Sequence, residues 1–221
     1  MPRRFSVSWR PSKSWTTYRA SGPTSTAPSS SWGPDLEPPP SPGSGPKGPP
    51  ALRVLGIDPG SRHTGWGVVD RRGSRLTAVA HGRISVASQG ALADRLVRLT
   101  TELHKLVELH RPQVAVLESL FHGINPRSLI VLAQARGALL ATVAAAGLEI
   151  REFSPAEIKS AITGSGRADK QQVDRMVRLS LGLGKVPLPS DTSDALAVAI
   201  CFSQRLKMDR LARPKGSAAR P

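Results

Sequence analysis

The segment LRVLGIDPG, residues 52–60, decides which fold the sequence predicts. Its apolar run ends in a carboxylate, Asp58, and a Pro-Gly pair follows, which is typical of a β-strand that runs into a turn. A second apolar run, QVAVL at residues 113–117, is also followed by a carboxylate, Glu118. Ligands of α/β sheets bind beyond the carboxyl ends of the strands. Asp58 and Glu118 are therefore the first candidate site residues, and they lie side by side if the two strands are neighbours.

The hydrophobic pattern around these strands predicts the other elements. Residues 65–70 and 75–86 form β-like segments separated by a short basic turn, and residues 148–153 form a fifth strand. The spacing of apolar residues, together with a capping box that begins at Ser154, predicts helices over residues 91–110, 126–146, 155–161, 170–181 and 190–206. Three opening strands followed by alternating helices and strands indicate an α/β domain with a mixed five-stranded sheet and helices on its faces.

The two ends of the chain differ from this domain in composition. Residues 1–50 contain 12 Pro, 5 Gly and 11 Ser with no helical or strand period, so they offer too little apolar surface to offset their chain entropy. We predict a disordered leader over residues 1–51, a domain over residues 52–206 and a flexible basic tail over residues 207–221. Because the ordered pattern begins abruptly, one hypothesis is that translation starts near residue 52 and not at Met1. N-terminal sequencing of the natural protein tests this.

The chain carries 31 Lys+Arg against 16 Asp+Glu, a formal net charge of +15. More than half of the excess lies on the flanks, since residues 1–50 contribute +4, residues 205–221 contribute +5 and residues 51–204 contribute +6. GC-rich coding raises the arginine content regardless of function. Even so, the excess favours a polyanionic partner, above all nucleic acid, because phosphate neutralisation releases counterions.

Other features exclude several classes of protein. The single cysteine, Cys201, excludes a disulfide scaffold and a cysteine-based zinc site, and it fits a reducing cytoplasm. The five histidines show no HExxH or similar pair. No unbroken apolar run reaches the about 18–20 residues that a membrane-spanning helix needs. We therefore expect a cytoplasmic protein with no membrane partner.

Two further acids, Asp191 and Asp194, lie three residues apart at the start of the last predicted helix and so share one face of its first turn. Taken singly, Asp58 could be a turn former, Glu118 a surface charge and Asp191 an N-cap. Converging carboxylates repel one another unless a cation lies among them, and Mg²⁺ prefers such oxygen ligands. One metal site accounts for all four acids. Two ions about 3.5–4 Å apart can drive phosphodiester hydrolysis.

Four blocks of the sequence resemble the bacterial RuvC family of crossover junction endodeoxyribonucleases. They are VLGIDPGSRHTGWGVVD at residues 54–70, VLESLFHGIN at 116–125, LAQARGALL at 132–140 and SDTSDALAVAI at 190–200. The resemblance extends over about residues 52–205. It implies a ribonuclease-H-like fold and a homodimer that resolves Holliday junctions in DNA recombination and repair. It also implies two Mg²⁺ ions per active site, with Mn²⁺ able to substitute, and cooperation with the RuvA–RuvB branch-migration complex.

The resemblance also assigns roles to individual residues. Asp58, Glu118, Asp191 and Asp194 match the metal-binding acids of the family, and Lys159 and Lys170 match two lysines near the scissile phosphate, Lys170 counting among the catalytic residues. Phe121 matches an aromatic that stacks on junction bases, a contact that contributes about 1–3 kcal/mol. Without the resemblance, these lysines read as ordinary solvated side chains and Phe121 as a core aromatic. In the block at residues 132–140 we expect packing and dimer support at least as much as DNA contact.

Two alternative functions belong to other classes. An actin-like ATP-binding protein would use residues 56–64 as a phosphate loop, but the second Asp-Gly-Gly loop that it needs is not found in the sequence. A catalytically silent module that only binds junctions is the other alternative. The complete set of four acids argues against it, because uncompensated carboxylates hinder phosphate binding.

Overall fold

The strand that the sequence singled out, β1 (Leu52–Asp58), lies in the middle of a five-stranded sheet with the order β3-β2-β1-β4-β5. This computed structural model describes residues 51–60, 62–86, 90–119, 126–184 and 187–212, apart from the side chains of 127 and 207–212. The other strands are β2 (His63–Arg72), β3 (Arg75–Ser85), β4 (Val114–Glu118) and β5 (Glu149–Phe153). The predicted fold class, a mixed five-stranded sheet flanked by helices, is confirmed.

Strand directions bring the two strand-end acids to one edge of the sheet. β1, β2 and β3 form an antiparallel meander, whereas β4 runs parallel to β1 and β5 runs parallel to β4. In the β1–β4 register, Ile57 is paired with Leu117. Asp58 and Glu118 each follow that pair directly, so the predicted neighbourhood of the two strands is correct.

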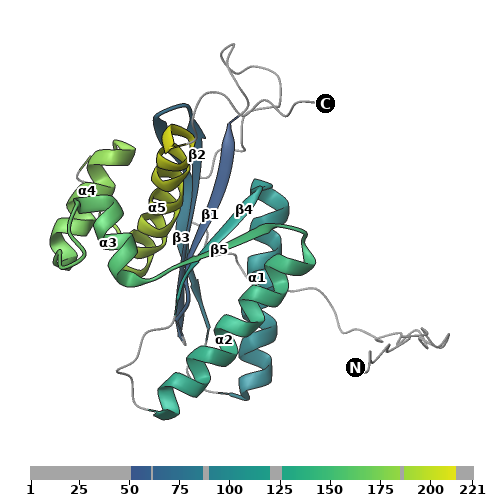
Figure 1. The fold of residues 1–221 in the computed structure, drawn as a ribbon. Coiled ribbons are helices and arrows are strands. Elements are labelled where there is room, and N and C mark those ends of the chain that lie inside the picture. The colour runs from purple at the N-terminus through teal and green to yellow at the C-terminus, as the bar shows by residue number, and fades with distance from the viewer. Residues whose placement is uncertain (1–50, 61, 87–89, 120–125, 185–186, 213–221) are drawn as a thin grey trace, which may run out of the picture. The chain divides into compact units, whose positions relative to one another are not determined.

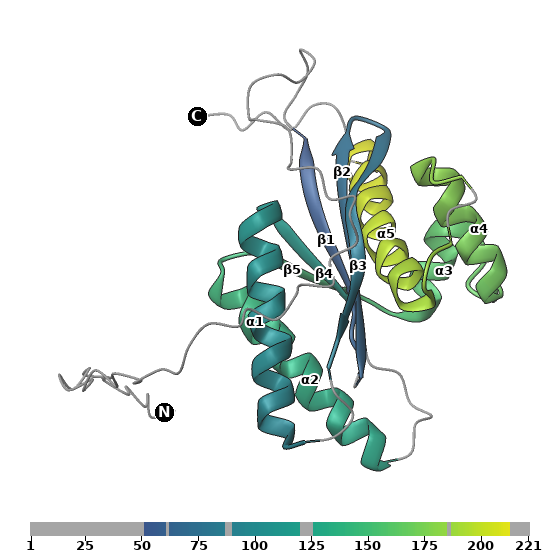
Figure 2. The same cartoon turned by 180° about the vertical axis from the view of Figure 1, so that it is seen from behind.

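Helices cover both faces of the sheet (Figure 1 and, from behind, Figure 2). One face packs against α1 (Leu92–His110) and α2 (Pro126–Ala145). The other face packs against α3 (Pro155–Thr163), α4 (Lys170–Leu181) and α5 (Ser190–Ala212). Two separate hydrophobic cores result, one on each side of the sheet.

The alternation of side chains along β1 assigns Asp58 to the α5 face. Leu55 and Ile57 belong to the core under α1 and α2, whereas Val54 belongs to the core under α5. Successive side chains of a strand point to opposite faces, so Asp58 lies on the same face as Val54 and Gly56. A buried strand thus presents its terminal carboxylate to the helix that carries the other two acids.

Helix α5 lies unusually close to the sheet because glycines face it. A Cβ atom at Gly56 would overlap the backbone oxygen of Ala195, and one at Gly65 would overlap the backbone oxygen of Asp191. Gly65 is paired with Asp58 across the β1–β2 ladder. The absence of side chains at these glycines therefore allows the first turn of α5 to rest directly beside Asp58.

The ends of the helices differ little from the prediction, except at the C-terminus. α5 extends to Ala212, six residues beyond the predicted 206, because residues 207–212 contain no Gly or Pro and Pro214 is the first strong helix breaker. At α3 the predicted capping box is present. Ser154 Oγ accepts a hydrogen bond from the Glu157 amide (3.3 Å), and Glu157 Oε2 accepts one from the Ser154 amide (2.9 Å).

Candidate active site

All four predicted acids gather at the carboxyl edge of β1 and β4. Asp58 and Glu118 end the two strands, and Asp191 and Asp194 lie in the first turn of α5. Burial raises the pKa of Asp58 to about 8, and the negative charges of Asp194, Glu118 and Asp191 contribute to the shift. Lys170 lowers this pKa but does not cancel the repulsion. The site therefore holds more negative charge than its own cations compensate.

Burial and neighbouring negative charge also act on Glu118. Burial raises its pKa, the charge of Asp194 raises it further, and Lys159 and Lys170 lower it. Both lysines that the sequence selected therefore act electrostatically on the acid cluster. Lys159 is half-buried on α3, and Lys170 is the first residue of α4.

Lys170 makes a direct contact with the cluster. Its Nζ donates a hydrogen bond to Asp194 Oδ2 at 2.9 Å, and this bond raises the pKa of the ammonium. The side chain remains 63% exposed. The start of α4 is fixed by a capping box, in which Asp169 Oδ1 accepts from the Gln172 amide at 2.8 Å. Lys170 is thus a solvent-accessible cation whose backbone is held in place.

Contacts from two strands and a loop fix the first turn of α5. Thr192 is fully buried, and its Oγ1 donates to the carbonyl oxygen of Gly82 in β3 at 3.1 Å. The Ser193 amide donates to the Pro189 carbonyl at 3.0 Å. Together with the close approach at Gly65, these bonds determine where Asp191 and Asp194 point.

Two arginines near the acids were not predicted from the sequence as part of the site. Arg83 Nη1 lies 3.8 Å from Asp191 Oδ2. Arg136 on α2 donates from Nε to the carbonyl oxygen of Glu118 (3.4 Å) and pairs through Nη2 with Glu152 Oε2 (2.7 Å). Arg83 lies in a strand without any motif. Arg136 belongs to a block for which we expected mainly packing and dimer support, so only the tertiary structure reveals either contact.

The chemistry of the donor set fits divalent, oxygen-binding cations. Within the described part of the chain, no three His, Cys, Asp or Glu side chains stand close enough to hold an ion as they are placed. Asp194, Glu118 and Asp191 nevertheless act together with burial to raise the pKa of Asp58, so a cation among these carboxylates would stabilise them. Hard cations such as Mg²⁺ are bound by oxygen ligands of this type. To ligate one, the side chains would have to draw together and Asp58 would have to lose its proton.

One predicted site residue cannot be placed. Phe121 lies in residues 120–125, outside the part of the chain that the structure describes. Its stacking on junction bases therefore stays a prediction.

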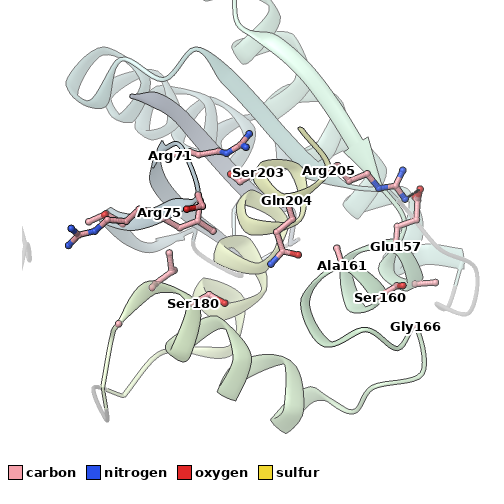
Figure 3. Close-up of a pocket in the computed structure, with 16 residues that line it drawn as sticks. Arg71, Arg75, Glu157, Ser160, Ala161, Gly166, Ser180, Ser203, Gln204 and Arg205 are labelled. Atoms are coloured by element: carbon pink, nitrogen blue, oxygen red, sulfur yellow. Dashed lines mark hydrogen bonds and ion pairs between the residues drawn. The ribbon is translucent and has the colours of Figure 1, made fainter. Parts of the chain in front are cut away.

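A large groove lies elsewhere, at the opposite end of α5. It has a volume of about 1260 Å³ and contains none of the four acids. Figure 3 shows the Gln204 amide pointing into it, with Arg205 beside Glu157 at its rim. Arg205 Nη2 pairs with Glu157 Oε1 at 2.8 Å. The acid cluster and this groove are thus separate regions.

Comparisons with known proteins agree with the geometry. Residues 54–202 match the family model described as Crossover junction endodeoxyribonuclease RuvC. Relatives with that name come from Rubrobacter xylanophilus, 46% identical over 69% of this chain and 87% of the relative, and from Bordetella pertussis, 44% identical over 77% and 95%.

Solved structures show the same similarity. The structure described as T. thermophilus RuvC in complex with Holliday junction substrate has a TM-score of 0.68 and 30% identity, covering 72% of this chain and 96% of that one. The yeast mitochondrial Holliday junction resolvase Ydc2 has a TM-score of 0.57 at 16% identity, covering 74% and 82%. The latter supports the fold alone.

Proposed function

The chain belongs to the RuvC family of crossover junction endodeoxyribonucleases, and from this premise we propose that its acid cluster is the site at which it cleaves Holliday junctions. The protein is a Holliday junction resolvase of DNA recombination and repair. The observation that carries the site assignment is the convergence of four carboxylates, with the pKa of Asp58 raised to about 8. Neither the ATP-binding nor the silent-module alternative is favoured.

Asp58, Glu118, Asp191 and Asp194 would hold two Mg²⁺ ions, with Mn²⁺ able to substitute. Such ions activate a water molecule and stabilise the leaving oxygen in phosphodiester hydrolysis. The carboxylates supply the negative charge that retains the cations, and burial of Asp58 strengthens that field. Each acid would thus contribute through its charge and its position at the strand or helix end.

Lys170 and Lys159 would orient the substrate phosphate. The Lys170 ammonium is exposed at the edge of the cluster while it contacts Asp194, so a phosphate could accept a hydrogen bond from it without entering the core. A cation in this position also stabilises the charge that develops on the phosphoryl oxygens. Lys159 lies on the Glu118 side, so the two lysines would flank the phosphate.

We also propose that α2 forms the interface of a homodimer. Ile130 is 60% exposed, and Ala133, Gly137 and Ala141 are exposed at helical spacing on the same helix. An apolar helix face of this kind is stabilised when a partner covers it. A second copy, related by a two-fold axis, would place a second active site on the four-way junction, whose symmetry matches. Sedimentation of the protein, compared with Ile130→Glu, tests this.

Helix α2 also bears on the expectation that the protein has no membrane partner. Residues Ser128–Ala145 have a mean hydropathy of 1.6 and are long and apolar enough to cross a membrane by length and composition, with only 17% of the window buried. The stretch is not an unbroken apolar run, because Gln134 and Arg136 interrupt it. Since Arg136 contacts Glu118 and Glu152, α2 belongs to the nuclease domain, and we favour a protein partner over lipid.

The remaining assignments follow from the same family membership. We propose a cytoplasmic location and cooperation with the RuvA–RuvB complex, because junction resolution takes place on chromosomal DNA. We also propose that residues 1–51 are dispensable for cleavage and that residues 207–221 add non-specific phosphate affinity. Deletion of residues 1–51 should leave the cleavage rate unchanged.

The decisive experiment compares the wild-type protein with Asp58→Asn on a labelled four-way junction, with Mg²⁺, Mn²⁺ or EDTA. We expect symmetric nicks from the wild type with either metal, and loss of cleavage but retention of junction binding in the variant. Asp94→Asn, on the exposed start of α1, is the matched control and should cleave normally. Equal cleavage by wild type and Asp58→Asn would overturn the site assignment, and binding without cleavage by the wild type would favour the silent module.

A further inference from the structure

A chain of polar contacts joins α4 to the first turn of α5 beside the acid cluster. Ser193 Oγ donates to Asp174 Oδ1 at 2.8 Å, and Arg178 Nε donates to Asp174 Oδ2 at 2.7 Å. Ser193 is 3% exposed, so its hydroxyl is held in one place. Burial would raise the pKa of Asp174, but the hydrogen bonds from Arg178 and Ser193 lower it. Asp174 is therefore a carboxylate whose two oxygens are both engaged.

These bonds distinguish Asp174 from the four acids of the site. The pKa values of Asp58 and Glu118 are raised by burial and by the neighbouring acids, whereas that of Asp174 is lowered by its own hydrogen bonds. A carboxylate that already accepts from a guanidinium and a hydroxyl has little to gain from a cation. Although Asp174 lies close to the cluster in the fold, its chemistry is that of a structural link.

This link shares both of its helices with the contact between Lys170 and Asp194. Lys170 and Asp174 are four residues apart on α4 and so lie on one face of that helix. Ser193 and Asp194 are adjacent on α5. Both pairs therefore join the same turns. The part-buried Ser193–Asp174 pair is 2.8 Å long, and the exposed Lys170–Asp194 pair is 2.9 Å long. Lys170, Asp174 and Ser193 line one groove of about 540 Å³ between the helices.

We propose that Asp174 is a positioning residue, which holds the start of α5 against α4 through Ser193 and so keeps the Lys170 ammonium opposite Asp194. The proposal rests on the proposed function of the acid cluster. Lys170 has a long and largely exposed side chain, so its place at the site depends on the spacing of the two helices. A displacement of about 1 Å in a catalytic group can cost roughly 100-fold in rate.

The first test is a mutant cycle measured by single-turnover cleavage of the junction. We expect Asp174→Ala and Ser193→Ala each to reduce the rate about 10-fold at unchanged junction affinity, and the double variant to be no slower, because both remove one link. In a Lys170→Ala background, Asp174→Ala should add less than a twofold loss. Full multiplication of the two losses would mean that Asp174 does not act through Lys170, and would overturn the proposal.

A second measurement does not depend on cleavage. NMR relaxation of ¹³C-labelled lysine reports the side-chain order of Lys170 on the ps–ns timescale. Asp174→Ala should lower that order, and Glu102→Ala, which removes the 2.9 Å pair with Lys105 on α1, should not. Unchanged order of Lys170 in a folded Asp174→Ala protein overturns the positioning role. Absence of cleavage by the wild type, in contrast, contradicts the proposed function and leaves this readout intact.

Discussion

Carboxylates that lie beside the two ends of α5 are in opposite electrostatic conditions. At its N-terminal end, burial and mutual repulsion raise the pKa values of Asp58 and Glu118. At its C-terminal end, hydrogen bonds from Ser154, followed by the charge of Arg205, lower the pKa of Glu157. Both sets of acids lie beside the same helix, but the hydrogen-bond donors around them differ. A carboxylate with its own donors stabilises the fold, whereas a group of carboxylates without enough donors is available for cations.

The largest expected contrast is between Glu118→Gln and Glu157→Gln. Glu118→Gln should reduce the cleavage rate at least about 100-fold, because it removes a charge that would hold a catalytic cation. A loss of about 1.36 kcal/mol in transition-state stabilisation lowers the rate tenfold, so a 100-fold loss corresponds to about 2.7 kcal/mol. Glu157→Gln should leave the cleavage rate within about twofold and lower the free energy of unfolding by less than about 1 kcal/mol, because glutamine can still accept the Ser154 bond and only the half-exposed pair with Arg205 is lost. Single-turnover cleavage and urea denaturation measure the two effects. Similar cleavage rates in both variants would contradict the assignment of a catalytic role to Glu118 and a structural role to Glu157.

A smaller contrast is expected between the cations. Lys170→Ala removes the ammonium that contacts Asp194 and should slow cleavage roughly 10- to 100-fold, in the range of a single electrostatic contact to the reacting group. Arg205→Ala removes the pair with Glu157 and the contact of the guanidinium with the Phe153 ring at 5.3 Å. It should leave cleavage unchanged and cost little stability, because the pair is largely exposed. The comparison is made at saturating Mg²⁺, with junction affinity measured in parallel.

The sequence predicted the acids better than the cations around them, because the pattern that marks the acids extends over only a few neighbouring residues. Asp58 and Glu118 follow apolar strands, and Asp191 and Asp194 share a helix turn, so short-range periodicity is sufficient to select all four. Lys170 contacts a residue 24 positions away. No local pattern encodes that contact, and only the family resemblance selected it.

The contacts that the sequence did not predict depend on how helices pack. Ser193 and Asp174 are 19 residues apart on different helices, and Arg83 reaches Asp191 from a strand. The close approach of α5 at Gly65 depends on strand pairing that places this glycine beside Asp58. Periodicity predicted the elements, but the register between them decides which polar groups meet.

The dependence of stability on pH sharpens the comparison further. The pKa of Asp58 rises from 3.8 in the unfolded chain to about 8 in the folded protein without metal. Between these values the folded state binds more protons than the unfolded state, so the free energy of unfolding decreases as pH increases. The contribution of Asp58 is complete below about pH 4 and is lost as pH rises through 8.

Urea denaturation in EDTA should therefore show the free energy of unfolding falling from pH 5 to pH 8, with a shallower slope in Asp58→Asn. Mg²⁺ should restore stability at pH 8, because it replaces the proton. Glu157→Gln should leave the slope between pH 5 and pH 8 unchanged, because the pKa of Glu157 is lowered from 4.5 and its stabilising contribution is lost only at more acidic pH. Identical slopes in the wild type and Asp58→Asn would mean that the acid cluster is electrostatically relaxed, which would remove the physical reason for assigning cations to it.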